Sequence, residues 1–189
     1  MKRTPWRRAI RFALTVAGLS FVLGGVFDTS TVFLNHAFWF IGAIAILVIV
    51  VVGALFDMLG VAAAAASETP FHAMASKRLF GARRAISIVR NAERVSSICS
   101  DVIGDIAGVL SGAGALAVGA QLSNTMHVTS WHREFVIILL TALTTAMTVA
   151  VKAIGKTLAI RVPTPIVLTA ARIADSILFY RRSPGRNRR

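Results

Sequence analysis

The sequence predicts an all-α integral membrane protein of about four transmembrane helices, with a cytoplasmic amphipathic helical loop and a C-terminal surface helix. Three observations lead to this fold class. The chain of 189 residues is 56% hydrophobic, whereas soluble domains are about 45–50% apolar. Its apolar residues gather in long uncharged runs. Its 21 basic residues lie between and outside those runs, as at the cytoplasmic flanks of membrane helices.

The apolar runs divide the chain into a basic cytoplasmic N-terminus (1–10), a transmembrane domain (11–160), and a juxtamembrane helix with a basic tail (161–189). The first run, 11–27, follows basic residues as a signal peptide would, but no A-x-A-like cleavage site follows, so we expect an uncleaved helix. The second, 38–66, exceeds the ~20 residues a crossing needs and is expected to tilt or to project into the interface. The third and fourth runs span 102–122 and 135–160. Period-two alternation is absent, which favours helices over a barrel.

The distribution of basic residues predicts the orientation. With four crossings, 20 of the 21 Lys and Arg residues fall on one side, and only Arg133 falls on the other. The positive-inside rule makes that side cytoplasmic, so both termini are expected inside the cell membrane. A three- or five-helix topology breaks this asymmetry.

The basic loop 67–100 is expected to be helical, because Ala82, Ala85 and Ile86 recur at helical spacing between arginines. Asn91 is expected to cap a further helix that has Glu93 in its first turn. This loop either touches anionic headgroups as an interfacial helix or is a solvated connector. A further surface helix is expected after Pro165.

Gly104, Gly108 and Gly112 are four residues apart on the third predicted helix. Small residues at this spacing allow two helix backbones to approach closely. The partner helix belongs either to the same chain or to a second subunit, and the pattern favours an intrachain contact with a dimer nearby.

Four charged residues are expected at similar depth near the cytoplasmic ends of the second, third and fourth runs: Asp57, Asp105, Lys152 and Lys156. Charges inside a bilayer are costly and are functional hypotheses by default. Either the aspartates neutralise the lysines by pairing, or they line a polar cavity for a hard cation, which takes oxygen ligands. In the second case Ser111, Thr144, Thr145 and Thr148 add hydroxyls, although interhelical hydrogen bonding is the more common role of such groups.

The composition also argues against other classes of protein. The net charge of +13 is compatible with nucleic-acid binding, but the basic residues do not gather as a soluble domain's basic face would, so no nucleic-acid partner is expected. Cys99 is the only cysteine, and His127 and His132 alone do not make a metal site. No nucleophile–base pair or catalytic motif is visible, so the chain is not expected to be an enzyme. No cofactor is expected unless Mg²⁺ binds.

Three stretches, AAASETPFHAMASKRL, GARRAISIVRNAERVSSI leading into GDIAGVLSGA, and KAIGKTLAI, together resemble the transmembrane domain of the CNNM/CorB–CorC family of magnesium-transport proteins. Their order and spacing agree over about 53–160. The resemblance implies a helical membrane domain, a homodimer and divalent-cation transport or homeostasis. The tandem CBS domains of many relatives are not expected in this chain.

The chain departs from the family pattern at the metal site that the resemblance implies. Lys152 stands where the family has a glutamate ligand and Gly155 where it has proline, whereas Lys156 matches. Asp105 stands near the family's asparagine ligand, and the serine ligand has no clear match. A lysine among cation ligands disfavours a cation there.

The sequence therefore leaves two functions open. The first is magnesium transport or homeostasis, with Asp57 and Asp105 as metal ligands. The second is a non-transporting membrane scaffold that associates with partner membrane proteins. A hydrated cavity at the aspartates favours transport, and tight pairing with Lys152 and Lys156 favours the scaffold.

Overall fold

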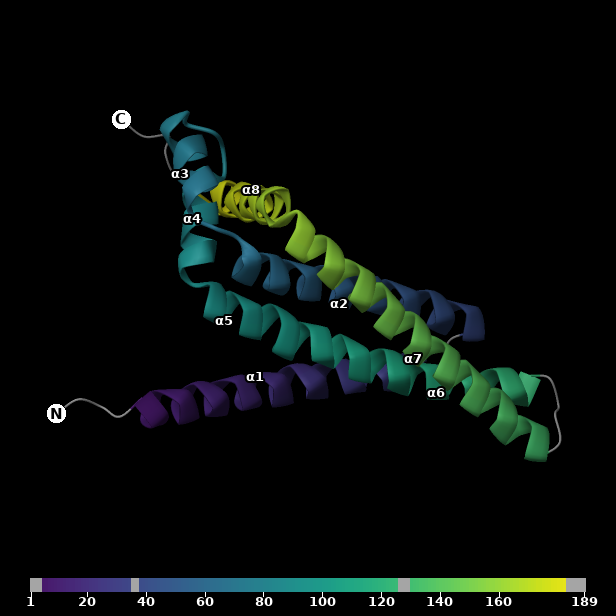
Figure 1. The fold of residues 1–189 in the computed structure, drawn as a ribbon. Helices are drawn as coiled ribbons and strands as arrows, with labels where there is room; N and C mark the ends of the chain where they lie inside the picture. The colour runs from purple at the N-terminus through teal and green to yellow at the C-terminus, as the bar shows by residue number, and fades with distance from the viewer. Residues whose placement is uncertain (1–4, 35–37, 126–129, 183–189) are drawn as a thin grey trace, which may run out of the picture.

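The computed structural model describes residues 5–34, 38–125 and 130–182, and these residues are helical with short connections and no strand (Figure 1). The prediction of an all-helical chain is therefore confirmed for this part of the sequence. In chain order the elements are α1 (Pro5–Leu34), α2 (Trp39–Ala65), α3 (Thr69–Ser76), α4 (Ala82–Arg90), α5 (Ala92–Ser96), the π-helix η1 (Ser97–Gly104), α6 (Asp105–Thr125), α7 (Ser130–Arg161) and α8 (Pro163–Arg182).

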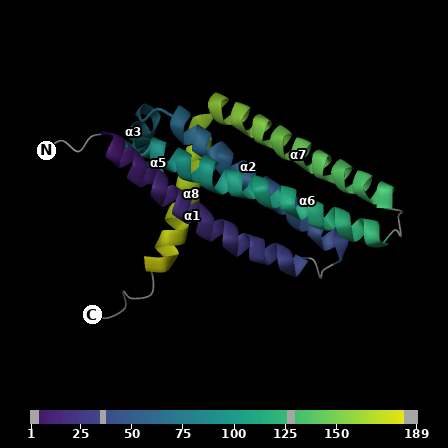
Figure 2. The same cartoon turned by 90° about the horizontal axis from the view of Figure 1, so that it is seen from below.

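Among the residues that the structure describes, three continuous helices have the length and the apolar composition to cross a membrane. They are Trp39–Ala65, the run α5–η1–α6 over Ala92–Thr125, and Trp131–Arg161. These three pack against one another, and α1 lies alongside α6 on the outside of the group (Figures 1 and 2). The described side chains of α1 include a shorter apolar stretch, Ile10–Gly25.

The predicted run 38–66 matches α2 to within one residue at each end, whereas the other three runs lie inside helices that are longer than the sequence suggested. The run expected at 11–27 belongs to a helix of 30 residues, and the run expected at 135–160 belongs to one of 32. The third run was expected to begin at 102, yet the helix is continuous from Ala92 and passes through the eight residues of η1. Hydropathy identifies only the apolar part of a helix, whereas the backbone hydrogen bonds of the helix continue through the polar turns at either end.

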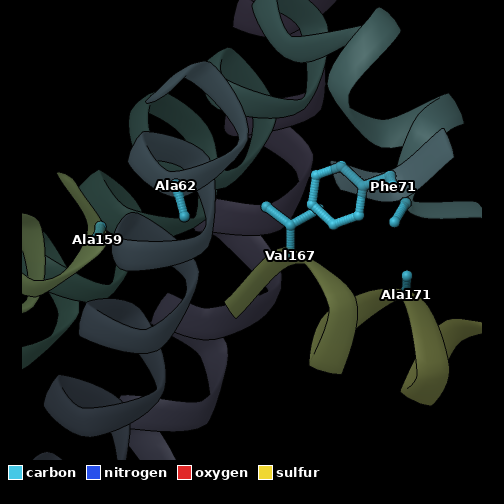
Figure 3. Close-up of a cluster of buried hydrophobic side chains, with 6 residues drawn as sticks. Ala62, Phe71, Ala159, Val167 and Ala171 are labelled. Atoms are coloured by element: carbon cyan, nitrogen blue, oxygen red, sulfur yellow. The ribbon is translucent and has the colours of Figure 1, made fainter. Parts of the chain in front are cut away.

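A cap formed by the short helices α3 and α4 and the 20-residue helix α8 covers one end of the three long helices. Figures 1 and 2 show α3, α4 and α8 at the end where α1 begins and where α2 and α7 finish. Its core is a cluster of buried apolar side chains from α2, α3, α4, α7 and α8, shown in Figure 3: Ala62, Phe71, Ala85, Ala159, Val167 and Ala171. The aromatic ring of Phe71 fills the space between α2 and α8 and is fully buried.

The basic loop is helical as predicted, and Asn91 is the N-cap residue of α5, although its side chain makes no capping hydrogen bond. Asn91 stands between α4 and α5, and Glu93 lies in the first turn of α5. The Asn91 side-chain amide instead donates to the carbonyl of Ser87, 2.8 Å away in the preceding helix, so it closes α4. The predicted C-terminal surface helix is α8, which begins two residues before Pro165.

Polar contacts between side chains hold the helices of the cap together. Arg90 Nε donates to Glu68 Oε2 at 3.0 Å, and His72 Nε2 lies 3.2 Å from the same oxygen. The hydrogen bond from Arg90, with that from His72, holds the pKa of Glu68 below its ordinary value. The Arg84 guanidinium donates to Asp175, which joins α4 to α8.

Candidate functional site

Asp57 lies on the face of α2 that contacts η1 and α6. Gly53 and Gly60, seven residues apart, lie on this same face, one turn to either side of Asp57. A β-carbon at Gly53 would lie 2.4 Å from Ala107 Cβ, and one at Gly60 would lie 2.5 Å from Ser100 Oγ. These two close approaches of the helix backbones bury Asp57, whose side chain is only 3% exposed.

The π-helix faces Asp57 across the interface. Ser100 Oγ donates to the Asp57 backbone carbonyl at 3.4 Å, and a β-carbon at Gly104 would lie 3.5 Å from Asp57 Cβ. A π-helix closes wider turns than an α-helix, and such segments are frequent at functional sites. Here η1 ends at Gly104, directly before Asp105.

Lys156 places its ammonium 3.2 Å from Asp57 Oδ2. The two atoms are close enough for an ion pair but are not aligned as a hydrogen bond, and Oδ2 is buried with no hydrogen-bond partner among the described residues. We regard the contact as electrostatic, because the distance is that of an ion pair while the directional requirement of a hydrogen bond is unmet. The Lys156 side chain is 49% exposed, so its cation reaches Asp57 from the edge of the bundle.

Lys152 lies one turn earlier on α7 and reaches the end of the π-helix. Its Nζ donates to the Gly104 carbonyl at 2.8 Å and lies 3.8 Å from Asp105 Oδ1. Asp105 is 74% exposed, so this second ion pair is loose. The main polar contact of the Lys152 ammonium is therefore its hydrogen bond to the Gly104 backbone carbonyl.

The structure thus brings the four predicted charged residues into one site between α2, η1–α6 and α7. Two acids and two bases make the site formally neutral, and each aspartate has a lysine within ion-pair distance. The site also joins parts of two of the three sequence stretches that carry the family resemblance, GDIAGVLSGA and KAIGKTLAI. The oxygen atoms of the site that suit a cation are those of the Asp57 carboxylate, the Gly104 carbonyl and the outward-facing Asp105 carboxylate.

The predicted glycine row does not form one continuous close contact. Gly104 faces α2, and a β-carbon at Gly108 would lie 3.7 Å from Lys152 Nζ, so both lie within the chain's own packing. At Gly112 an added β-carbon would meet nothing within 4 Å. Among the glycines, the closest approach of α2 to α6 is instead at Gly53. Gly53 was not predicted from the sequence, although its spacing from Gly60 places both residues on one face of the helix.

The hydroxyls considered as additional cation ligands all bond within their own helices. Thr144, Thr145 and Thr148 each donate to the carbonyl four residues earlier, and Ser111 donates to the carbonyl of Gly108. Each hydroxyl therefore uses its hydrogen within its own helix rather than in the interhelical bond that we expected as the more common role. A hydroxyl that donates its hydrogen still has acceptor lone pairs, so the ligand role of these residues stays a prediction. Within residues 5–34, 38–125 and 130–182, no group of three or more His, Cys, Asp and Glu side chains is arranged to hold a metal ion.

No protein-family model, no curated protein and no solved structure matches this chain.

Proposed function

We propose that this chain is a helical membrane domain that binds and moves a divalent cation, with Mg²⁺ as the expected cargo, at the charged site around Asp57. One observation carries the proposal. Asp57 Oδ2 is buried and lacks a hydrogen bond, although nearly all buried polar atoms in proteins have such a partner. A hard cation that keeps part of its water shell and takes one or two carboxylates fits an oxygen of this kind.

In this proposal the two lysines are internal cations that compete with the metal. Lys156 neutralises the charge of Asp57 without donating a hydrogen bond to Oδ2. Because its side chain is half exposed, Lys156 can swing away from the carboxylate. Lys152 binds the Gly104 carbonyl, a second oxygen near the same carboxylate. Entry of a divalent cation then requires at least Lys156 to be displaced. The resemblance to the CNNM/CorB–CorC family supports the same function, and the homodimer it implies stays a prediction.

Charge substitution at Lys152 tests this function. In reconstituted vesicles, we expect slow Mg²⁺ uptake by the natural protein and faster uptake by Lys152→Glu, because the substitution removes a competing cation and adds a carboxylate near the Gly104 carbonyl. Asp57→Asn should abolish uptake in both backgrounds. Choline chloride at equal ionic strength is the control. Transport is ruled out if neither the natural protein nor Lys152→Glu moves Mg²⁺ and neither shows Mg²⁺-dependent melting.

A membrane scaffold is the second candidate, and the pairing of both aspartates with lysines favours it. In that case the charged site only holds α2, η1 and α7 together. Mg²⁺ should then have no effect on any variant, and co-purification from native membranes should recover a partner membrane protein in constant ratio.

We also propose that the chain crosses the cell membrane four times, with α1 as the first span and the helical cap in the cytoplasm. In a Cys99→Ala background, we expect Thr29→Cys and Thr125→Cys to react with an impermeant thiol reagent in intact cells. Ser76→Cys, in the cap, should react only after permeabilisation, because it lies at the end that carries the basic residues. All three side chains are exposed. Reaction of Ser76→Cys in intact cells would overturn this topology, and protection of Thr29→Cys would remove α1 from the set of spans.

A further inference from the structure

An open cleft of about 380 Å³ lies in the helical cap, away from the charged site. Its lining residues come from the end of α3, the turn that follows, the start of α4 and α8: Ala75, Arg78, Leu79, Gly81, Arg83 and Asp175. Its volume is many times the ~30 Å³ that one water occupies in the liquid, so it can take a hydrated phosphate group.

The cleft is positively charged. The carboxylate of Asp175 is paired with Arg84, and this pairing cancels part of its electrostatic repulsion of a bound anion. Arg78 and Arg83 have no carboxylate within ion-pair distance among the described residues, in contrast to Arg90, which is paired with Glu68. A guanidinium presents paired N–H donors that match two oxygens of a phosphate, so two such groups at one cleft favour that ligand.

The backbone at Arg78 departs from what local structure prefers. α3 ends in a Schellman motif, in which Leu79 N donates to Met74 O at 3.1 Å and Arg78 N donates to Ala75 O at 3.0 Å. The residue in the left-handed position of this motif is usually glycine, yet here it is Arg78, with φ of 56°. Among the described residues it is the one non-glycine with positive φ. The motif requires a left-handed residue at this position but not an arginine, so the presence of Arg78 points to a role for its side chain.

The tip of the same turn is apolar and exposed. Leu79 and Phe80 are 44% and 55% exposed, and they follow directly after Arg78. Given the membrane placement proposed above, these two side chains would enter the interface and bring the cleft to the depth of the lipid headgroups. A free phosphate in solution would need no such apolar neighbours.

We propose that this cleft binds the phosphate of an anionic phospholipid headgroup through Arg78 and Arg83. Gly81 keeps the floor of the cleft close to α8, since a β-carbon there would lie 2.8 Å from Arg172 Cγ. The bound lipid ties the turn between α3 and α4 to the membrane surface, independently of whether the charged site transports a cation.

The test is lipid-dependent melting of the purified full-length protein in detergent, with bound lipid counted by native mass spectrometry. Added phosphatidylglycerol should raise the melting temperature, because a ligand that binds only the folded state stabilises it, and phosphatidylcholine should not. Arg78→Gly and Arg83→Gln should each weaken phosphatidylglycerol binding by about tenfold. Arg94→Gln removes one exposed, unpaired arginine from α5, outside the cleft, and should bind as the natural protein does.

Arg78→Gly separates binding from folding. Glycine suits the left-handed position, so this variant should melt at the same temperature as the natural protein, or higher, when no lipid is added. The proposal is overturned if Arg94→Gln weakens binding as much as Arg78→Gly, since the attraction would then be diffuse. It is also overturned if inorganic phosphate at the same concentration stabilises as strongly as phosphatidylglycerol, because the cleft would then be a site for a soluble anion.

Discussion

Lys156→Met should lower the stability of the purified protein by about 3 kcal/mol, the largest loss we expect from one substitution of a charged residue in this chain. The substitution leaves the Asp57 carboxylate buried with no cation within ion-pair distance, while Met keeps most of the apolar part of the lysine side chain. Because Lys156 is itself half exposed, the loss should lie at the lower end of the range for broken buried ion pairs. Thermal melting in detergent measures it.

Two matched variants give this experiment its controls. Lys156→Met combined with Asp57→Asn should recover most of the lost stability, because no uncompensated charge then remains. Mg²⁺ at millimolar concentration should restore the melting temperature of Lys156→Met but not that of the double variant, if Asp57 binds a divalent cation. If KCl at equal ionic strength restores the melting temperature of Lys156→Met equally well, the effect of Mg²⁺ is charge screening and not binding. A Lys156→Met protein that melts like the natural one would show that Asp57 does not depend on this lysine.

Gly53→Ala should destabilise the protein by about 1–3 kcal/mol, although alanine favours helices over glycine. The new methyl group would lie 2.4 Å from Ala107 Cβ, and Ala107 has no flexible side chain that could move aside. α2 and α6 must therefore separate along the interface that buries Asp57. The predicted loss is measurable by thermal melting, and it should be accompanied by greater exposure of Cys99 to thiol reagents, because Cys99 lies on η1 against α2.

Gly112→Ala is the control on the neighbouring helix. Here an added β-carbon meets nothing within 4 Å, so the helix preference of alanine should leave stability unchanged or raise it by up to about 1 kcal/mol. Equal melting of Gly53→Ala and the natural protein would contradict the close contact of α2 with α6. A loss of stability in Gly112→Ala, with a smaller particle mass in detergent, would instead place Gly112 at a contact between two copies of the chain.

The sequence by itself determined which segments are helical and that four charged residues lie at one level of the helix group. The run expected at 38–66 is α2, Trp39–Ala65, because a long apolar stretch with a single charged residue has few alternatives to a helix. The basic loop was recognisable because its apolar and charged residues alternate at helical spacing, and α4 buries Ala82 and Ala85 as that spacing required. The spacing of Asp57 from the end of its helix, and of Lys152 from Lys156, was likewise sufficient to place these residues near one another.

Only the tertiary structure decided which helix faces meet and which partners the charges take. In a membrane an apolar side chain suits lipid and protein alike, so hydropathy does not reveal the packing face. The row of Gly104, Gly108 and Gly112 was therefore expected as one contact, while the tightest approach is at Gly53. The carbonyl of Gly104, which binds Lys152, was also invisible in the sequence, because every residue has a carbonyl and only the π-helix brings this one to the lysine. Such contacts depend on backbone positions across three helices, which no local pattern of residues encodes.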